Sequence, residues 1–147
     1  MDNDSDESLI QNIFDQSQAG AAVVSPSGEW IRVNAYLCEM LGYEEHELLG
    51  MTFQEVTLPE DLASEQPYLE RLTSGGIQHY QFRKRYLHKT GNIVWGVLDR
   101  TVVRDAEGQP RYFISRIRDI TAEKAAEPKP KAISKFIERL QGLLQRK

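Results

Sequence analysis

The chain has 147 residues and a net charge of −4 at pH 7, and its apolar content is ordinary for a globular protein. This length suits one domain of about 100 to 150 residues with short appendages, and no apolar run approaches the roughly 20 residues that span a bilayer. The acidic N-terminus, the lone Cys38 and the modest negative charge exclude a signal peptide, a disulfide framework and a zinc site of several cysteines; they also disfavour nucleic acid as a partner and indicate a cytoplasmic protein.

The first elements follow from capping and turn signals. Residues 1–8 are acidic, and we expect them to be disordered. Ser8 and Gln11 have the spacing of a capping box, which predicts a short amphipathic helix. From Ala21 a brief apolar strand leads through a turn rich in proline and glycine into a second strand that ends at Val33.

Three helices are predicted in the middle of the chain. Asn34 suits the N-cap of a helix over 35–41, and a second short helix covers 44–49. A third helix starts around Pro59 and ends at a pair of glycines. Because a proline inside a helix removes a backbone hydrogen bond, we expect this helix to break or restart at Pro67.

From Ile77 onward apolar and polar residues alternate, which is the period of strands. Two short turns, Lys89–Asn92 and Asp105–Gly108, join three long strands into an antiparallel meander. The first two strands placed beside this meander give an α+β domain whose sheet is covered by helices on one face.

The basic run 83–85 lies within the first of these strands. Since side chains alternate along a strand, Arg83 and Arg85 share one face and Lys84 faces the other. The alternatives are a phosphate-binding patch and a solvated face, and we favour the solvated face.

The end of the chain separates into a linker and a helix. Residues 122–130 form a charged linker with two prolines, and residues 131–147 form an amphipathic helix. Its apolar side chains recur at intervals of three and four residues: Ile133, Phe136, Ile137, Leu140, Leu143 and Leu144. Three interpretations stay open, namely self-association or signal transmission, attachment to an anionic membrane surface, and folding back onto the same domain.

Taken in order, several short motifs resemble those of a PAS domain, the sensory PAS/PAC family, over residues 9–121. They are the turn at Gly28, the stretches 33–43 and 47–50, Pro59–Asp61, the segment 85–91, Val94-Trp95 and the closing Asp119–Thr121. The resemblance implies the PAS fold, with a five-stranded antiparallel sheet, short helices, a small interior cavity and flanking helices at both termini. It also implies that Asp119 and Thr121 form a signal hinge between the last strand and the outgoing helix.

The same resemblance bears on cofactors. The flavin-binding LOV branch has a reactive cysteine in an Asn-Cys-Arg-Phe-type motif where this chain has residues 53–57, and Cys38 lies on an earlier helix. Haem-binding members carry an axial histidine on the long helix, and the stretch 61–68 has none. We therefore expect neither flavin–cysteinyl photochemistry nor haem, and the three scattered histidines predict no metal site.

An interior ligand pocket would be lined by the residues that face the predicted core. The candidates are Asn34, Leu37, Met40, Leu41, Phe53, Leu72, Phe82, Phe113 and Ser115. A ligand there would be small and mostly apolar. Alternatively these side chains pack together and leave no cavity.

The sequence thus predicts a non-enzymatic sensory or protein-interaction domain in signal transduction. We expect it to dimerise and to regulate a partner or an output domain. One alternative is a small enzyme with an enclosed pocket, for which Asp99 is the carboxylate of interest. The other is an adaptor that binds a membrane surface through the C-terminal helix.

Overall fold

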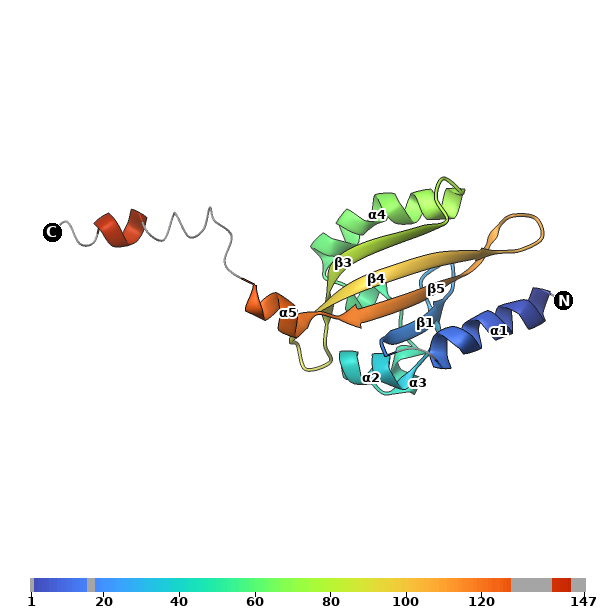
Figure 1. The fold of residues 1–147 in the computed structure, drawn as a ribbon, viewed down its shortest axis with the longest axis horizontal. Helices are drawn as coiled ribbons and strands as arrows, with labels where there is room; N and C mark the ends of the chain where they lie inside the picture. The colour runs from blue at the N-terminus through green and yellow to red at the C-terminus, as the bar shows by residue number, and fades with distance from the viewer. Residues whose placement is uncertain (1, 16–17, 128–138, 144–147) are drawn as a thin grey trace.

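The computed structural model describes residues 2–15, 18–127 and 139–143 (Figure 1). The elements in chain order are α1 (Asp2–Asp15), β1 (Gly20–Val24), β2 (Trp30–Val33), α2 (Ala35–Leu41), α3 (Glu45–Leu48), the 3-10 turn η1 (Gln54–Val56), α4 (Pro59–Ser74), β3 (His79–Leu87), β4 (Ile93–Arg104), β5 (Pro110–Asp119) and α5 (Thr121–Ala126).

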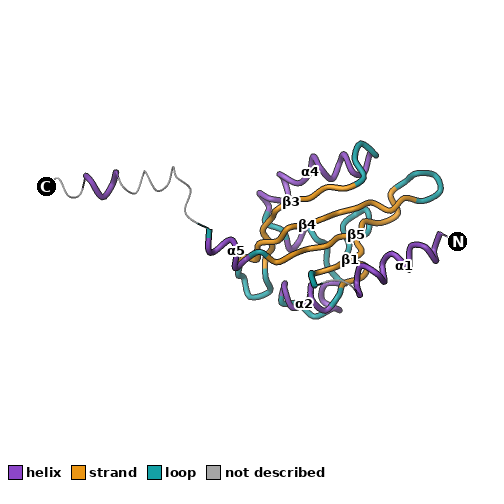
Figure 2. Tube along the Cα trace, viewed as in Figure 1, coloured by secondary structure: helices purple, strands orange, loops and turns teal. Residues whose placement is uncertain are grey.

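The strands form one antiparallel sheet in the order β2-β1-β5-β4-β3. The predicted meander is its β3-β4-β5 half, and the first strand joins that half by pairing with the last (Figure 2). This arrangement confirms the predicted α+β fold with five antiparallel strands.

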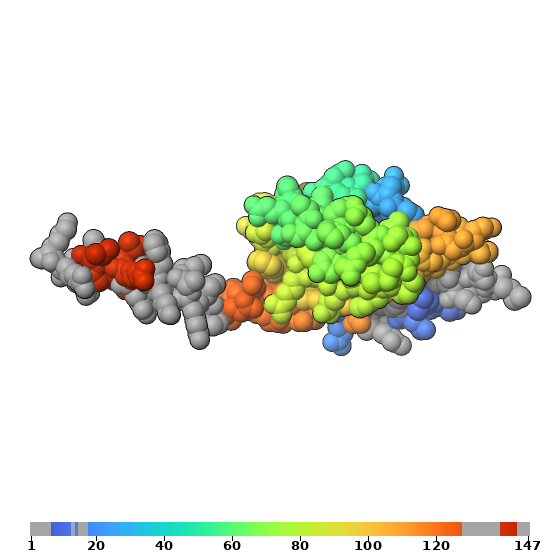
Figure 3. Space-filling model, turned by 90° about the horizontal axis from the view of Figure 1, so that it is seen from above, coloured from blue at the N-terminus to red at the C-terminus, as the bar shows by residue number. Residues whose placement is uncertain are grey.

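The main core lies between one face of the sheet, here called the inner face, and the helices α2, α3 and α4. In the space-filling view α4 and the edge strand β3 make up much of the visible surface (Figure 3). The opposite, outer face carries a smaller apolar cluster, in which Ile10 of α1 packs with Val23 and Ile114. The N-terminal helix therefore covers the face that the other helices leave open.

Local signals explain how the inner helices begin and end. The Asn34 side chain accepts the backbone N–H of Leu37 at 3.0 Å, so it is the N-cap of α2 as predicted.

The turn between β1 and β2 needs a glycine, because Gly28 has φ of 102° and a Cβ atom there would lie 2.1 Å from the Gln54 side chain.

Three predicted boundaries differ from the structure. α1 begins at Asp2, so residues 2–8 are helical where disorder was predicted; a sequence that is acidic at the start of a helix is favoured by the helix dipole. α5 takes up the first residues of the predicted linker 122–130. α4 continues through Pro67 without a break, because its apolar side packs on the sheet both before and after the proline.

The predicted C-terminal helix is described only in part. Residues 139–143 are helical, and the apolar Leu140 and Leu143 are 46% and 63% exposed. The other residues of the predicted apolar stripe, Ile133, Phe136, Ile137 and Leu144, lie outside the described residues.

Candidate functional site

The residues predicted to line an interior pocket gather around one core. Leu37, Met40, Leu41, Phe53, Leu72 and Phe113 belong to the same buried cluster, and Phe82 packs against it. Ser115 is fully buried. Asn34 stands apart, because its side-chain oxygen already accepts the backbone N–H groups of Ala21 and Leu37.

Three charged side chains and a phenol meet inside this core. Glu65 of α4 accepts hydrogen bonds from Lys84 Nζ at 2.8 Å and from Arg100 Nη1 at 2.9 Å. The Tyr80 hydroxyl donates to Glu65 and accepts from Arg100 Nη1 at 2.9 Å. We call these four residues the buried charge cluster. Its charged members are at most 1% exposed, so it holds two cations and one carboxylate away from water.

Aromatic rings flank the two cations. The Phe53 ring centroid lies 4.3 Å from Arg100 Cζ and 4.9 Å from Lys84 Nζ, and the Tyr86 ring lies 5.0 Å from the same ammonium. Arg100 Nε also donates to Ser115 Oγ at 3.3 Å. Cation–π contacts of this kind offset part of the desolvation of a buried cation.

Burial and charge act against each other on the pKa values of the cluster. Burial lowers the pKa of Lys84 to about 8, although the Glu65 carboxylate opposes this change. Burial alone would raise the pKa of Glu65, but Lys84 and Arg100 together outweigh it and hold that pKa below its usual value. Burial raises the pKa of Tyr80, which stays protonated at neutral pH.

This cluster was not predicted from the sequence. Lys84 does face away from its arginine neighbours, as predicted, but the basic run was expected to be solvated and Lys84 is buried. The available signal was the period of the strands: Lys84 lies between Phe82 and Tyr86 on the inner face, and Arg100 occupies an inner-face position on β4. The acidic partner could not be deduced, because Glu65 comes from a helix 19 residues earlier in the chain.

A second set of contacts links α4 to α5 across the edge of the sheet. Asp61 of α4 accepts from the backbone N–H of Arg85 at 2.7 Å and from its guanidinium at 2.6 and 3.0 Å. These hydrogen bonds from Arg85 are the main reason why the pKa of Asp61 is lowered. The Arg85 guanidinium lies 5.6 Å from the Trp95 ring, and Lys124 Nζ of α5 lies 4.7 Å from the same ring.

The two predicted hinge residues lie where β5 passes into α5. Asp119 Oδ1 accepts the backbone N–H of Thr121 at 2.9 Å, and Thr121 Oγ1 accepts the backbone N–H of Trp95 at 3.0 Å. The backbone N–H of Ile120 donates to the Trp95 carbonyl at 2.9 Å. The start of α5 is therefore tied to β4 at a single residue, Trp95.

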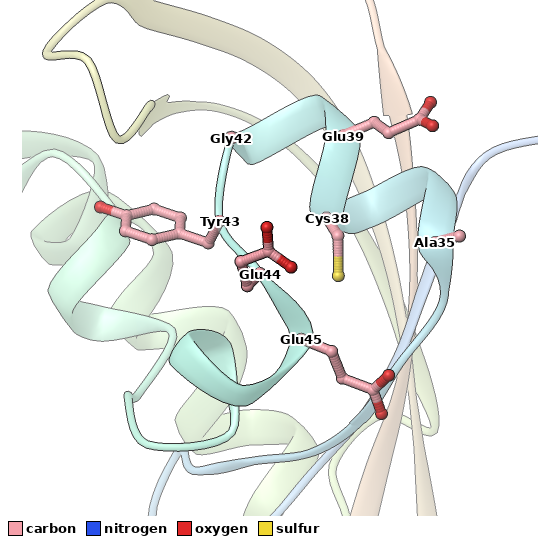
Figure 4. Close-up of a pocket in the computed structure, with 7 residues that line it drawn as sticks. All are labelled: Ala35, Cys38, Glu39, Gly42, Tyr43, Glu44 and Glu45. Carbon is pink, nitrogen blue, oxygen red and sulfur yellow. The ribbon is translucent and has the colours of Figure 1, made fainter.

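A surface hollow of about 450 Å³ lies between α2 and α3 (Figure 4). The Cys38 thiol points into it, with the carboxylates of Glu44 and Glu45 nearby. Burial raises the pKa of Cys38, and the two carboxylates add to that effect, so the thiol is not activated as a nucleophile.

The carboxylate proposed for a pocket enzyme lies elsewhere. The Asp99 side chain is 41% exposed and accepts from Gln81 at 3.1 Å on the outer side of the sheet, away from the core. Within the described residues, no group of three or more histidine, cysteine, aspartate or glutamate side chains could hold a metal ion, and no helix is long and apolar enough to cross a membrane.

Residues 14–125 match the family model described as PAS fold. The chain is 41% identical over 121 residues to the probable diguanylate cyclase DgcE of Escherichia coli, covering 82% of this chain and 11% of that protein. It is 23% identical over 121 residues to the sensor histidine kinase TmoS of Ectopseudomonas mendocina, covering 82% of this chain and 12% of that protein. The chain thus spans about a tenth of the length of these two relatives.

Two solved structures are similar in fold. One is a PAS domain of a protein from Colwellia psychrerythraea, with 20% identity and a TM-score of 0.69 over 79% of this chain and 98% of that one. The other is a LOV protein from Rhodobacter sphaeroides, with 21% identity and a TM-score of 0.68 over 82% of this chain and 69% of that one. At these identities the similarity concerns the fold alone.

Proposed function

Because the chain belongs to the PAS fold family, we propose that it is a non-enzymatic sensory and protein-interaction module that works in the cytoplasm. PAS domains of this kind occur in sensor histidine kinases and diguanylate cyclases, and therefore in signal transduction. The module regulates an output domain or a partner protein and acts as a homodimer. Its signal leaves through the C-terminal side of the sheet.

The observation that carries this proposal is the attachment of α5. The start of α5 is hydrogen-bonded to β4 at Trp95, so it can change its position when these contacts change, whereas the sheet behind it stays packed. Asp61, Arg85, Trp95 and Lys124 form a continuous series of contacts from α4 to α5. Such a series supports coupling between the two helices, and direct measurement of coupling is the stronger evidence.

The C-terminal helix supplies the proposed dimer contact. Leu140 and Leu143 expose large apolar side chains on the described helical segment, and apolar side chains at this spacing are typical of helices that pair. Burial of this exposed apolar surface against a second copy of the chain is favourable, because it removes apolar side chains from water.

Sedimentation velocity on the full chain tests the dimer. We expect the wild-type chain to sediment as a dimer and Leu140→Glu to sediment as a monomer, because a buried carboxylate in the helix pair is unfavourable. Gln141→Glu adds the same charge at the neighbouring exposed position, so it should leave the dimer intact. A Leu140→Glu protein with the wild-type mass would rule out this contact.

A further inference from the structure

We propose that Lys84, Arg100 and Tyr80 form the recognition site for a small carboxylate ligand, and that Glu65 of α4 occupies this site as an internal substitute for that ligand. The inference rests on the proposed sensory function and gives the chemical class of what is sensed. It replaces the small apolar ligand expected from the sequence with a small anionic one.

The buried charge cluster holds more positive than negative charge. Lys84 and Arg100 bring two positive charges, and Glu65 brings one negative charge, with all three side chains at most 1% exposed. Two buried cations are costly unless a counter-charge is supplied, and Glu65 supplies it in this structure. A ligand carboxylate can supply the same charge in place of Glu65.

Lys84 and Tyr86 have hydrogen-bond donors that are not used in the described structure. The Lys84 ammonium has three N–H donors, and within the described part of the chain one of them finds an acceptor, Glu65 Oε1. The Tyr86 hydroxyl is buried and has no hydrogen-bond partner in the described structure, and its ring lies 5.0 Å from Lys84 Nζ. Buried donors without partners are rare in proteins, and they point to a group that the site accommodates at other times.

The backbone hydrogen bonding of α4 is interrupted just after Glu65. The fully buried residues of this 16-residue helix are Glu65 itself and Leu72. Pro67, two residues after Glu65, has no N–H and therefore leaves the carbonyl of Ala63 without its helical hydrogen bond. A helix with a proline at this point bends there at lower cost than a regular helix.

These features together describe a site with an exchangeable occupant. An incoming carboxylate takes the hydrogen bonds of Lys84, Arg100 and Tyr80, and its apolar part lies against the flanking Phe53 ring. Glu65 then turns toward solvent, and α4 shifts at Pro67. Because Asp61 lies one turn before Glu65 on α4 and holds Arg85, this shift reaches Trp95 and the start of α5.

The test is isothermal titration calorimetry on the full chain with sodium benzoate and sodium propionate, and with sodium chloride and sodium sulfate at matched ionic strength. In the wild type the ligand must displace Glu65. Its apparent affinity is therefore its intrinsic affinity multiplied by the fraction of molecules in which Glu65 has left the site. Glu65→Gln removes the competing carboxylate and keeps the shape of the side chain. We expect it to bind a carboxylate about tenfold more tightly than the wild type.

Two variants serve as controls. Glu70→Gln makes the same charge change at an exposed position of α4 and should bind as the wild type does. Lys84→Met added to Glu65→Gln should abolish binding. Equal affinities of Glu65→Gln and Glu70→Gln would overturn the inference, and so would chloride or sulfate binding as tightly as the carboxylates.

If Glu65→Gln does not fold, hydrogen exchange of the wild type with benzoate decides the question. Faster exchange over residues 59–74 supports displacement of Glu65, whereas unchanged exchange with no heat of binding contradicts it. If the chain dimerises but binds no carboxylate, the ligand site is refuted and the proposed dimer is not. The proposed dimer fails separately, by the sedimentation of Leu140→Glu.

Discussion

At the scale of single residues, Lys84 shows how a local environment changes the chemistry of a side chain. Its two neighbours on β3, Arg83 and Arg85, are in contact with solvent, but its own ammonium is 0% exposed and touches Glu65 and two aromatic rings. Its folded pKa of about 8 lies below the roughly 10.4 of an unfolded lysine. Because the pKa of Lys84 is lower in the folded state, burying the charged form of this lysine makes folding less favourable.

This shift predicts an unusual pH dependence of stability. Between pH 8 and 10 the unfolded chain binds more protons at Lys84 than the folded chain does, so the free energy of unfolding should rise with pH, by about 1–2 kcal/mol over this window. Unfolded tyrosine ionises near pH 10, so the raised pKa values of Tyr80 and Tyr86 give an opposite effect that begins in the upper part of this window. The raised pKa of Cys38 also opposes the rise. Urea denaturation at pH 7.5 and 9.5 measures the rise.

Lys84→Met should remove this rise, because methionine does not titrate. Lys89→Met is the matched control: the Lys89 ammonium is half exposed, and its pKa is raised by the hydrogen bonds that it donates to Glu47, so the rise should persist in that variant. The same slope in wild type and Lys84→Met would show that Lys84 is not the group responsible.

At the scale of elements, the two helices that flank the proposed site differ in how they are held. α4 is a long helix with a proline in its interior, and its strongest contacts with β3 are ionic. α5 is a short helix that starts at a threonine hydrogen-bonded to β4. The start of α5 is attached through few polar contacts, which is typical of elements that move in switching.

Pro67→Ala should stabilise α4. The new N–H can donate to the Ala63 carbonyl. We expect a net gain of about 1 kcal/mol in the free energy of unfolding, because the larger entropy of the unfolded chain without proline offsets part of the gain. Amide exchange over residues 59–74 should slow. Gln66→Ala changes an exposed neighbour without altering the backbone and should leave exchange unchanged.

Thr121→Val should loosen α5. Valine keeps the shape of threonine but cannot accept the N–H of Trp95, and an unsatisfied, partly buried N–H costs about 1 kcal/mol. We expect faster amide exchange over residues 122–126, while exchange within β4 beyond Trp95 stays slow. Thr101→Val, at an exposed strand position, is the control. Equal exchange in the two variants would mean that the Thr121 hydroxyl does not hold the helix.

At the scale of the whole molecule, the sheet separates a large core from a small one. The inner face is covered by three helices, whereas the outer face is covered at one place by α1, whose Ile10 packs on Val23 and Ile114 of the sheet. Stability should therefore depend mainly on the inner face. The outer cluster attaches the N-terminal helix.

Leu98→Ala, in the inner core, should lower the free energy of unfolding by about 2–5 kcal/mol, since Leu98 is fully buried. Ile10→Ala, in the outer cluster, should cost less and should leave the transition of the inner core cooperative. Ile31→Ala, at a position 47% exposed, is the control and should have a small effect. Urea unfolding followed by fluorescence gives all three values, and an Ile10→Ala cost equal to that of Leu98→Ala would contradict the division.

The sequence by itself determined the family, the strand order of the meander and the N-cap at Asn34, because these depend on local periodicity, capping and turn chemistry. The predicted boundaries were wrong at residues 2–8, at Pro67 and after Thr121, where tertiary packing or the helix dipole outweighs local propensity. Only the tertiary structure decided that Glu65, Lys84 and Arg100 meet. Each comes from a different element, and a charged residue is buried only when folding brings its partner to it, which no local pattern records.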